Sequence, residues 1–308
     1  MKKLIFFGVI YFALIMLCSA FEYKVFNRTT GNKIPFSRMI SSLSEYSDVI
    51  FVGEKHDDVY SHIIENRIFT NIYRFYPRVA LSMEMFERDV QKILDEYLSG
   101  SMRREEFLVK SRAWRKYMTD YHSLVVFAKI HHLPVIAANI PRKYASFIAK
   151  NGWKDIEKLP NEQRILIAEK LVVIKDKYYK KFMKTMCTAM GGSANPMLER
   201  IYLAQCIKDD TMAESIFRYR KRYPYRKIIH FNGSFHSDEN LGTVQKLLKM
   251  DPTLKCAVIS VIPVIGPLPE TIRPKDQKNG DYIIYCPRLS NSKTKPISSK
   301  MFKGFMKK

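Results

Sequence analysis

Apolar and polar positions alternate along the chain between short strand-like runs and longer helical ones. Apolar runs of strand length occupy residues 49–52, 79–83, 133–138, 227–231 and 256–262. Between them, apolar residues recur at helical spacing, which predicts amphipathic helices. The predicted helices cover residues 59–76, 89–98, 104–111, 118–131, 141–150, 162–180, 196–223 and 241–250. Strands separated by helices indicate an α/β fold with a mostly parallel sheet and helices on both faces.

Three segments depart from this alternation. Residues 155–223 carry no strand signal, so we interpret them as a helical insertion between the two parts of an α/β domain, 21–154 and 224–290. Residues 281–286 form a late apolar run, a candidate antiparallel edge strand. The Lys- and Ser-rich residues 291–308 predict a loose basic tail.

The first twenty residues have the pattern of an export signal. A short positive start precedes an apolar run from Leu4 to Leu17, and small residues end the segment at Ala20. This order predicts a secretory signal peptide over residues 1–20, cleaved after Ala20. The alternative is a lipid anchor at Cys18, but the residue before it is Leu17, where a small residue is expected. Both interpretations predict a periplasmic, envelope-associated or secreted protein.

The chain is strongly basic, with a formal net charge of +22 and 46% hydrophobic residues. A charge of this size is typical of nucleic-acid-binding proteins. Because the predicted signal peptide leads out of the cytoplasm, we expect no nucleic-acid partner and instead an anionic lipid surface or an acidic small ligand.

Four cysteines follow the predicted signal peptide. An even number in an oxidising compartment permits disulfides, and the pairs nearest in sequence are Cys187–Cys206 and Cys256–Cys286. None of these cysteines has the spacing of a zinc site.

Polar side chains follow four of the predicted strands. The stretch Gly53-Glu-Lys-His56 comes after the first strand and Gly233-Ser-Phe-His236 after the fourth, while Glu84 and Asn139 end two others. Ligands of parallel α/β sheets bind outside the carboxyl ends of the strands. We therefore expect Glu54, His56, Glu84, Asn139 and His236 to share one crevice, where imidazoles suit metal coordination or proton transfer.

Each of these groups also has a structural interpretation. Glu54 could pair with Lys55 or Arg142, and Glu84 could cap the following helix. Asp57 and Asp58 open a helix, where carboxylates are favoured as caps. Arg142 begins another helix and could bind an anionic ligand, or pair with Glu84 or Asp210.

Helical segments carry a second group of candidates. Trp114, Tyr117 and Tyr121 lie at helical spacing, which is typical of a core but also of a face that grips a flat macrocycle. Gln205 and Asp209 share one helix face that could point at the crevice. We interpret four further histidines as core or surface groups; they are His62, His122, His131 and His132.

Several short motifs occur together in a fixed order. They are Gly53-Glu-x-His56, Glu84-Met, Trp114-x-x-Tyr117, Ala138-Asn-x-Pro-Arg142, Asp209-Asp-x-Met-Ala213 and Gly233-x-x-His236. This set resembles the ChaN-like family of bacterial haem-binding envelope proteins, over roughly residues 45–262. The resemblance implies an α/β domain with a helical part, and haem binding in iron acquisition. Family members are commonly lipoproteins, whereas the lipidation signal here is imperfect.

The resemblance also implies site residues for haem. Tyr117, Tyr121 and Tyr144 are candidate contacts because the family is tyrosine-rich around these helices. Tyr117 and Tyr121, with His56 and His236, are candidate ligands of the haem iron, and no single one is selected.

Basic residues such as Arg142 would meet the haem propionates. The partners expected beside haem are an outer-membrane haem receptor, a membrane surface and a second copy of the chain.

The same family is similar to Tiki metalloproteases and erythromycin esterases. That relation implies an alternative, a metal-dependent hydrolase in which His56, Glu84 and His236 hold a divalent ion or act as acid and base. We favour haem binding without catalysis.

Overall fold

One eight-stranded sheet forms the centre of the molecule. The computed structural model describes residues 21–189 and 196–289. The strands are β1 (Lys24–Asn27), β2 (Lys33–Ile34), β3 (Val49–Glu54), β4 (Val79–Glu87), β5 (Val135–Asn139), β6 (Lys227–Gly233), β7 (Cys256–Val264) and β8 (Tyr282–Pro287). Their order is β2-β1-β8-β7-β3-β6-β4-β5. The strands from β8 to β5 are parallel, and β1 and β2 add an antiparallel end, which confirms the predicted α/β class.

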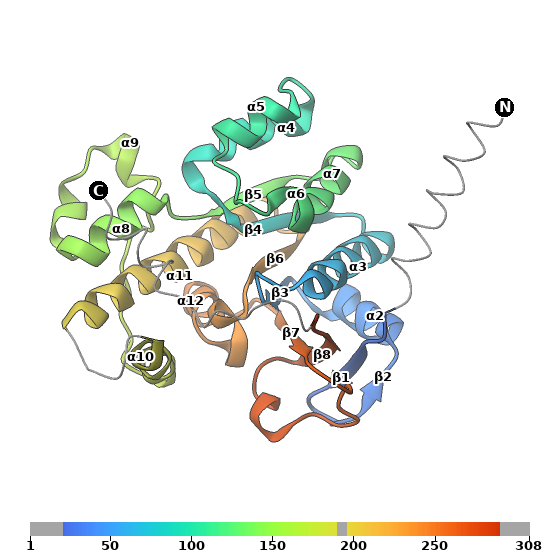
Figure 1. Cartoon of the computed structure of the whole chain (residues 1–308). Coiled ribbons are helices and arrows are strands. Elements are labelled where there is room, and N and C mark those ends of the chain that lie inside the picture. Colours follow the sequence, from blue (N-terminus) through green and yellow to red (C-terminus); the bar gives the residue numbers. More distant parts are fainter. Residues whose placement is uncertain (1–20, 190–195, 290–308) are drawn as a thin grey trace.

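Helices cover both faces of the sheet (Figure 1). They are α2 (Phe36–Tyr46), α3 (Val59–Phe75), α4 (Gln91–Ser99), α5 (Arg104–Lys110), α6 (Tyr117–Asp120), α7 (His122–Ile130), α8 (Arg142–Asn151), α9 (Asn161–Arg164), α10 (Lys177–Ala189), α11 (Pro196–Arg222) and α12 (Thr243–Met250). Helices α2, α3 and α7 lie over one face, and α11 and α12 over the other.

The central strand β3 shows why this arrangement needs two helical layers. Its residues are all buried. Ile50 and Val52 pack into the core beneath α3, whereas Val49 and Phe51 pack toward α11 and α12. A parallel strand buried on both sides has no solvent face, so the apolar run lacks the alternation of a surface strand.

Two predicted elements differ from the structure. The late strand β8 is not an antiparallel edge: it pairs in parallel with β7 and lies inside the sheet, because the unpredicted strands β1 and β2 cover its other side. The predicted helix over 162–180 is interrupted between α9 and α10.

Side chains of α11 capture the backbone of that interrupted segment. Thr211 Oγ1 accepts from Ala168 N at 3.1 Å, and Asp210 Oδ2 accepts from Val172 N at 2.9 Å. These tertiary bonds replace the helical ones that the local sequence favoured.

The predicted disulfides are wrong, because all four described cysteines are free thiols. On the β7–β8 ladder Cys286 lies opposite Pro263, and Cys256 lies at the other end of β7. A strand advances about 3.3 Å per residue, so Cys256 and Cys286 are far beyond bonding distance.

The predicted signal peptide, Cys18 and the basic tail lie outside the described residues. The division into an α/β domain and an insertion at 155–223 stays a prediction; within that range, α11 packs against α8, α12 and β5. None of the helices in the described part of the chain is long and apolar enough to cross a membrane.

Candidate functional site

The carboxyl ends of β3, β4 and β6 meet at one edge of the sheet. In the parallel ladder Glu54 lies beside Gly233, and Met83 beside Phe231. Strand β4 continues beyond Glu84, with a register shift between Met83 and Glu87. Such irregularities re-aim side chains, and here the Glu84 Oε2 atom accepts a hydrogen bond from Gly233 N at 2.7 Å.

His56 is oriented by a buried carboxylate. Its Nδ1 atom lies 2.6 Å from Oε1 of Glu54, and the same oxygen accepts from the Tyr121 hydroxyl at 2.7 Å. The imidazole meets the Trp114 ring edge-on, with centroids 5.1 Å apart. Because Glu54 occupies Nδ1, the second nitrogen, Nε2, remains for a ligand or a proton.

His236 is oriented in the same way on the other side of the sheet edge. Its Nδ1 atom lies 2.7 Å from Oδ1 of Asp209, a fully buried residue of α11. Asp209 also accepts hydrogen bonds from the hydroxyls of Tyr178 and Thr243, at 2.7 and 2.8 Å. The Nε2 atom of His236 faces Oε1 of Glu84 at 3.5 Å.

The absence of a side chain at Gly233 lets these groups converge. A Cβ atom there would lie 2.6 Å from Nε2 of His56 and 3.6 Å from Oε2 of Glu84. Contacts as short as 2.6 Å do not occur between a real Cβ and its neighbours, so any other residue would displace the imidazole. The structure thus brings His56, Glu84 and His236 together, as the strand-end pattern predicted.

Ion pairing dominates the electrostatics of this edge. Burial alone would raise the pKa of Glu84, but the charges of His236 and His56 hold it well below its usual range. For His236, burial would lower the pKa, but Glu84 and Asp209 raise it to about 10. Burial also opposes the charge of His56, yet Glu54 and then Glu84 raise the pKa of that imidazole. Both histidines are therefore strong proton acceptors.

The predicted tyrosines lie deeper than the histidines. The Tyr117 hydroxyl is buried and has no hydrogen-bond partner among the described residues. Its ring packs against Phe86 and Phe107. The Tyr144 hydroxyl donates to Gln163 at 3.0 Å, within a separate cluster around α8.

Asn139 and Arg142 lie close together in the sequence, and each has a protein partner. The Asn139 amide donates to the backbone oxygen of Glu84 at 3.0 Å, so it supports β4. Arg142 Nε donates to Glu87 at 2.5 Å rather than pairing with Glu84 or Asp210, and its side chain stays 62% exposed.

Two further residues lie near this edge. From the sequence, His62 is interpreted as a core or surface group and Glu65 is not singled out. His62 and Glu65 of α3 are both buried and lie beside Glu54. Their spacing of three positions places them on one helix face. This spacing is the feature of the sequence that could have identified them as a pair. The interpretation of Asp58 as a cap is confirmed, since its Oδ1 atom accepts from Ser61 N at 2.8 Å.

A cavity of about 710 Å³ lies apart from these residues, between α10 and the beginning of α11. Its lining residues are Tyr179, Lys180, Met183, Cys187, Pro196, Leu198 and Glu199. None of the strand-end side chains contributes to it.

Comparison with known proteins places the chain in a family. A family described as haem-binding uptake, Tiki superfamily, ChaN matches residues 39–247. The chain belongs to this ChaN family. The structure of ChaN of Campylobacter jejuni, described for its cofacial haem binding, is similar with a TM-score of 0.66 and 20% identity, over 86% of this chain and 96% of that one. At that identity the likeness shows the fold.

Two further solved structures are similar at lower scores. A mutant of the erythromycin esterase EreC has a TM-score of 0.48 and 12% identity, over 87% of this chain and 83% of that one. The type III effector HopBA1 has the same score and identity, over 82% of this chain and 92% of that one. No curated protein matches the chain.

The strand-end side chains include imidazoles, which are among the groups that can hold haem iron. Among the predicted iron ligands, the side chain of His56 is 31% exposed, whereas that of His236 is 8% exposed and the residues Tyr117 and Tyr121 are each 1% exposed. A ligand arriving from solvent therefore reaches His56 first. Lys55 follows β3 directly and Arg142 begins α8, and both are exposed cations.

Proposed function

We propose that this chain binds haem at the carboxyl edge of its sheet and takes part in haem uptake. The observation that carries the proposal is the match to the haem-binding ChaN family over residues 39–247. The fold shared with ChaN of Campylobacter jejuni supports it.

His56 is the residue that we assign to the haem iron. Its Nδ1 atom is held by Glu54, which fixes the ring and leaves Nε2 for coordination. Tyr121 remains the alternative ligand, but its hydroxyl would have to leave Glu54. Burial and the adjacent Glu54 also raise the pKa of Tyr121, which opposes formation of a tyrosinate. When bound, the haem iron would supply the Lewis acid that Nε2 of His56 meets, while Glu54 orients the imidazole and keeps its proton on Nδ1.

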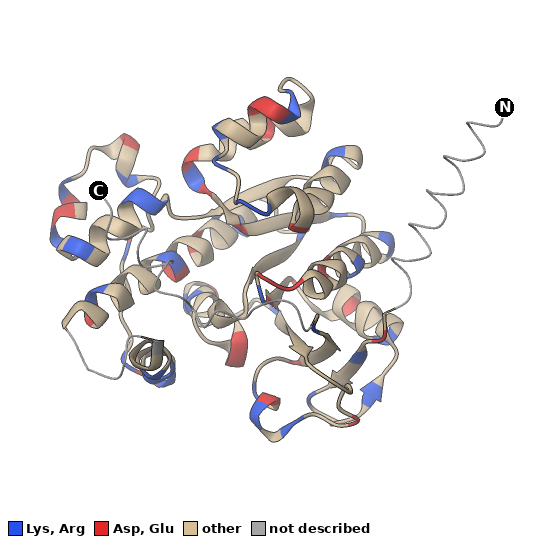
Figure 2. Cartoon of the chain, in the orientation of Figure 1, with Lys and Arg blue, Asp and Glu red and all other residues tan. Residues whose placement is uncertain are grey.

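Basic residues serve the haem propionates in this proposal. Lys55 and Arg142 lie beside the strand ends, although each has a protein partner, Ser234 for Lys55 and Glu87 for Arg142. Lys and Arg are spread over several elements around the molecule (Figure 2), and the net charge is +22. Such a surface accelerates the approach of a dianionic ligand, and salt screens the effect.

The proposal extends to the place where uptake occurs. The signal-like residues 1–20 support export to the periplasm or the outside, with attachment through Cys18 as the lipidated variant. In that compartment we propose an outer-membrane haem receptor as the donor, contact with an anionic membrane surface, and a homodimer as the carrier form.

A haemin titration of the mature chain tests the proposal. We expect a saturable shift of the Soret band with an imidazole-type ferric spectrum, and a loss of affinity of about tenfold or more in H56Q, equivalent to about 1.4 kcal/mol. H131Q is the matched control, because His131 is an exposed histidine at the end of α7.

The outcomes separate the candidate ligands. A tyrosinate-type spectrum that survives in H56Q and disappears in Y121F moves the iron to Tyr121. No saturable spectral change in the wild-type chain contradicts haem binding itself.

A second candidate function rests on the paired imidazoles. His56 and His236 are each oriented by a buried carboxylate and both meet beside Glu84. Two such histidines can serve as acid and base in hydrolysis, with or without a divalent ion held by these residues.

Hydrolysis of a chromogenic ester by the metal-supplemented chain tests that candidate. Activity that disappears in both H56Q and H236Q supports it. Activity that persists in both variants contradicts it.

A further inference from the structure

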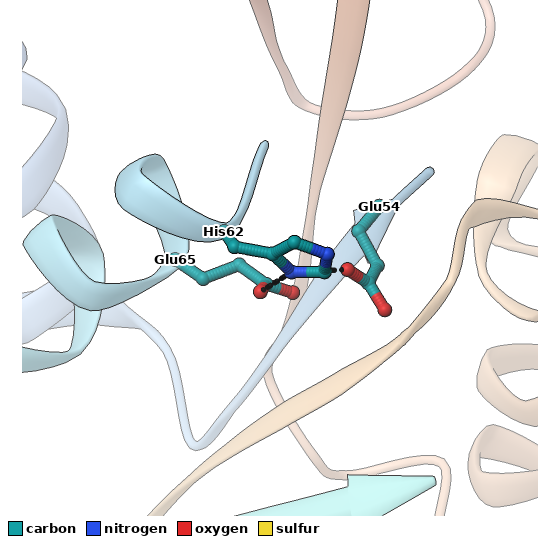
Figure 3. Close-up of side chains that lie close together, drawn as sticks. All are labelled: Glu54, His62 and Glu65. Atoms are coloured by element: carbon teal, nitrogen blue, oxygen red, sulfur yellow. Dashed lines mark hydrogen bonds and ion pairs between the residues drawn. The ribbon is translucent and has the colours of Figure 1, made fainter. Parts of the chain in front are cut away.

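A buried cluster beside the haem site contains Glu54 and two residues, His62 and Glu65, that have no part in the proposed binding of haem. Figure 3 shows the imidazole of His62 between the carboxylates of Glu54 and Glu65. Glu54 ends β3, while His62 and Glu65 lie on one face of α3. The Asp58 cap fixes the beginning of that helix, so the register of both α3 residues is set before any ligand arrives.

The distances suit a single small cation. The Nδ1 atom of His62 lies 2.9 Å from Oε2 of Glu54 and 2.9 Å from Oε2 of Glu65. The three ligand atoms all lie within 4.8 Å of one another. In a tetrahedral site with bonds of about 2.0–2.1 Å, neighbouring ligand atoms are about 3.3 Å apart. Small side-chain rotations are enough to enclose an ion.

The hydrogen-bond acceptors around His62 leave the cluster short of a donor. On the Nδ1 side the ring faces only the two carboxylates, Glu54 and Glu65. On the Nε2 side it faces only the backbone oxygen of His56 at 3.4 Å and Oδ2 of Asp120 at 3.5 Å. A neutral imidazole has one donor and one acceptor nitrogen. The lone pair of its acceptor nitrogen would therefore face the lone pairs of the neighbouring oxygens. Either a second proton or a metal ion resolves this conflict.

Two buried oxygens strengthen the case for an ion. Oε1 of Glu65 has no hydrogen-bond donor among the described residues, and Oε2 of Glu54 has there only its 2.9 Å ion-pair contact with Nδ1 of His62. The two residues are 1% and 0% exposed. Carboxylates in this position are retained when they are paired or coordinate a metal. One proton on Nδ1 cannot serve both carboxylates, whereas a divalent ion can.

We propose that Glu54, His62 and Glu65 bind a divalent first-row transition-metal ion through Nδ1 of His62 and one oxygen of each carboxylate. Two carboxylates and one imidazole suit Zn²⁺, Mn²⁺ or Fe²⁺. With Nδ1 on the metal, Nε2 carries the hydrogen and donates toward the His56 backbone oxygen. Metal-bound histidines generally donate their other nitrogen to a carbonyl or carboxylate in this way.

The site is structural and indirectly linked to His56. The ion joins α3 to the end of β3 inside the core. Glu54 binds the ion through Oε2, and its Oε1 atom keeps the contacts with His56 and Tyr121. These ligands differ from the strand-end set of His56, Glu84 and His236, which contains two imidazoles rather than one.

Metal analysis of the mature chain, prepared without haem, tests the proposal. After treatment with a chelator, the protein is titrated with Zn²⁺ and with Co²⁺ as a visible probe, and its metal content is measured after desalting. We expect one ion per wild-type chain and affinity lower by about tenfold or more in E65Q, equivalent to about 1.4 kcal/mol. H236Q and H131Q should keep the wild-type affinity.

X-ray absorption of the wild-type zinc complex decides the ligand set even where E65Q does not fold. One imidazole with oxygen ligands supports the site at Glu54, His62 and Glu65. Two imidazoles, or loss of the ion in H236Q, assign the metal to the strand ends and overturn the proposal, as does a wild-type chain that retains no metal. Each of these results is independent of whether the chain binds haem.

Discussion

At the scale of single residues, the site depends on buried carboxylates that fix imidazoles. Glu54 orients His56, and Asp209 orients His236, so that both rings converge beside Gly233. Burial would raise the pKa of Glu54, but His56 and His62 lower it to about 2. This carboxylate therefore stays charged across the physiological range.

Replacing Gly233 with alanine tests the convergence. The new Cβ would lie 2.6 Å from Nε2 of His56, so the imidazole must move away from Glu84. We expect G233A to fold and to lose about tenfold in haemin affinity, equivalent to about 1.4 kcal/mol. G152A is the control for the backbone cost of losing a glycine. A Cβ at Gly152 meets no neighbouring atom, but the positive φ there strains any other residue. Equal haemin affinities in wild type and G233A would show that the His56 ring position is irrelevant.

His236 gives the unfolding free energy a dependence on pH. Its pKa is raised from 6.5 to about 10 in the folded chain, so the protonated form contributes stability that is complete below about pH 6.5 and disappears as pH rises through about 10. We expect denaturant unfolding of the haem-free chain to lose up to about 1.4 kcal/mol per pH unit in this window. H236Q should be less stable at neutral pH and should show a flatter profile. Parallel profiles for the two proteins would contradict the ion pair.

At the scale of elements, the site is assembled by strand ends and by the beginning of a helix. The first turn of α3 starts at the Asp58 cap and carries His62 and then Glu65 toward β3. On the other face, α11 supplies Asp209 to the end of β6. Both faces of the sheet therefore contribute side chains to one edge.

Removing the Asp58 cap should loosen the turn of α3 that positions His62. We expect D58A to lower the free energy of unfolding by about 1 kcal/mol and to weaken the proposed metal site, because the turn that positions His62 frays. D57A is the matched control, since Asp57 is exposed, pairs with Arg288 and does not cap α3. Urea unfolding and Zn²⁺ titration of both variants check this. If D58A and D57A behave alike, the cap does not set the position of His62.

At the scale of the whole molecule, packing rather than cross-links holds the fold. The described cysteines are free: Cys187 and Cys206 share one apolar cluster without a bond, whereas Cys256 and Cys286 lie in different clusters. Burial raises the pKa of Cys206 and that of Cys256 to about 12 each, so neither thiol is reactive at neutral pH. The core on both faces of the sheet provides the stability instead.

Thiol titration checks this view of the molecule. In denaturant the mature chain should show free thiols at Cys187, Cys206, Cys256 and Cys286 without prior reduction. In the native state Cys206 and Cys286 should react slowly, because they are buried. The melting temperature should be the same with and without a reductant. A drop in melting temperature on reduction would reveal a cross-link that this structure lacks.

The sequence predicted which strand-end side chains converge better than it predicted the buried residues around them. Glu54, His56, Glu84 and His236 could be placed together because carboxyl ends of parallel strands share one edge. The burial of His62 and Glu65 could not be predicted, since a polar pair on an amphipathic helix looks the same whether it faces water or a buried carboxylate.

Long-range contacts also explain the errors in the fold. The segment between α9 and α10 favours a helix locally, but Asp210 and Thr211 of the distant α11 bind its backbone. Strands β1 and β2 are too short to give a clear period, so the position of β8 in the sheet was predicted wrongly.

The most direct test of the account is a nuclear magnetic resonance titration of the labelled chain with gallium protoporphyrin, a diamagnetic analogue of haem. We predict that the backbone amide signals of Gly53 and Gly233 shift with saturation, because both glycines lie at the strand ends beside His56 and Glu84. Shifts confined to Met183, Leu198 and their neighbours in the α10–α11 cavity, with Gly53 and Gly233 unchanged, would contradict a haem site at the edge of the sheet.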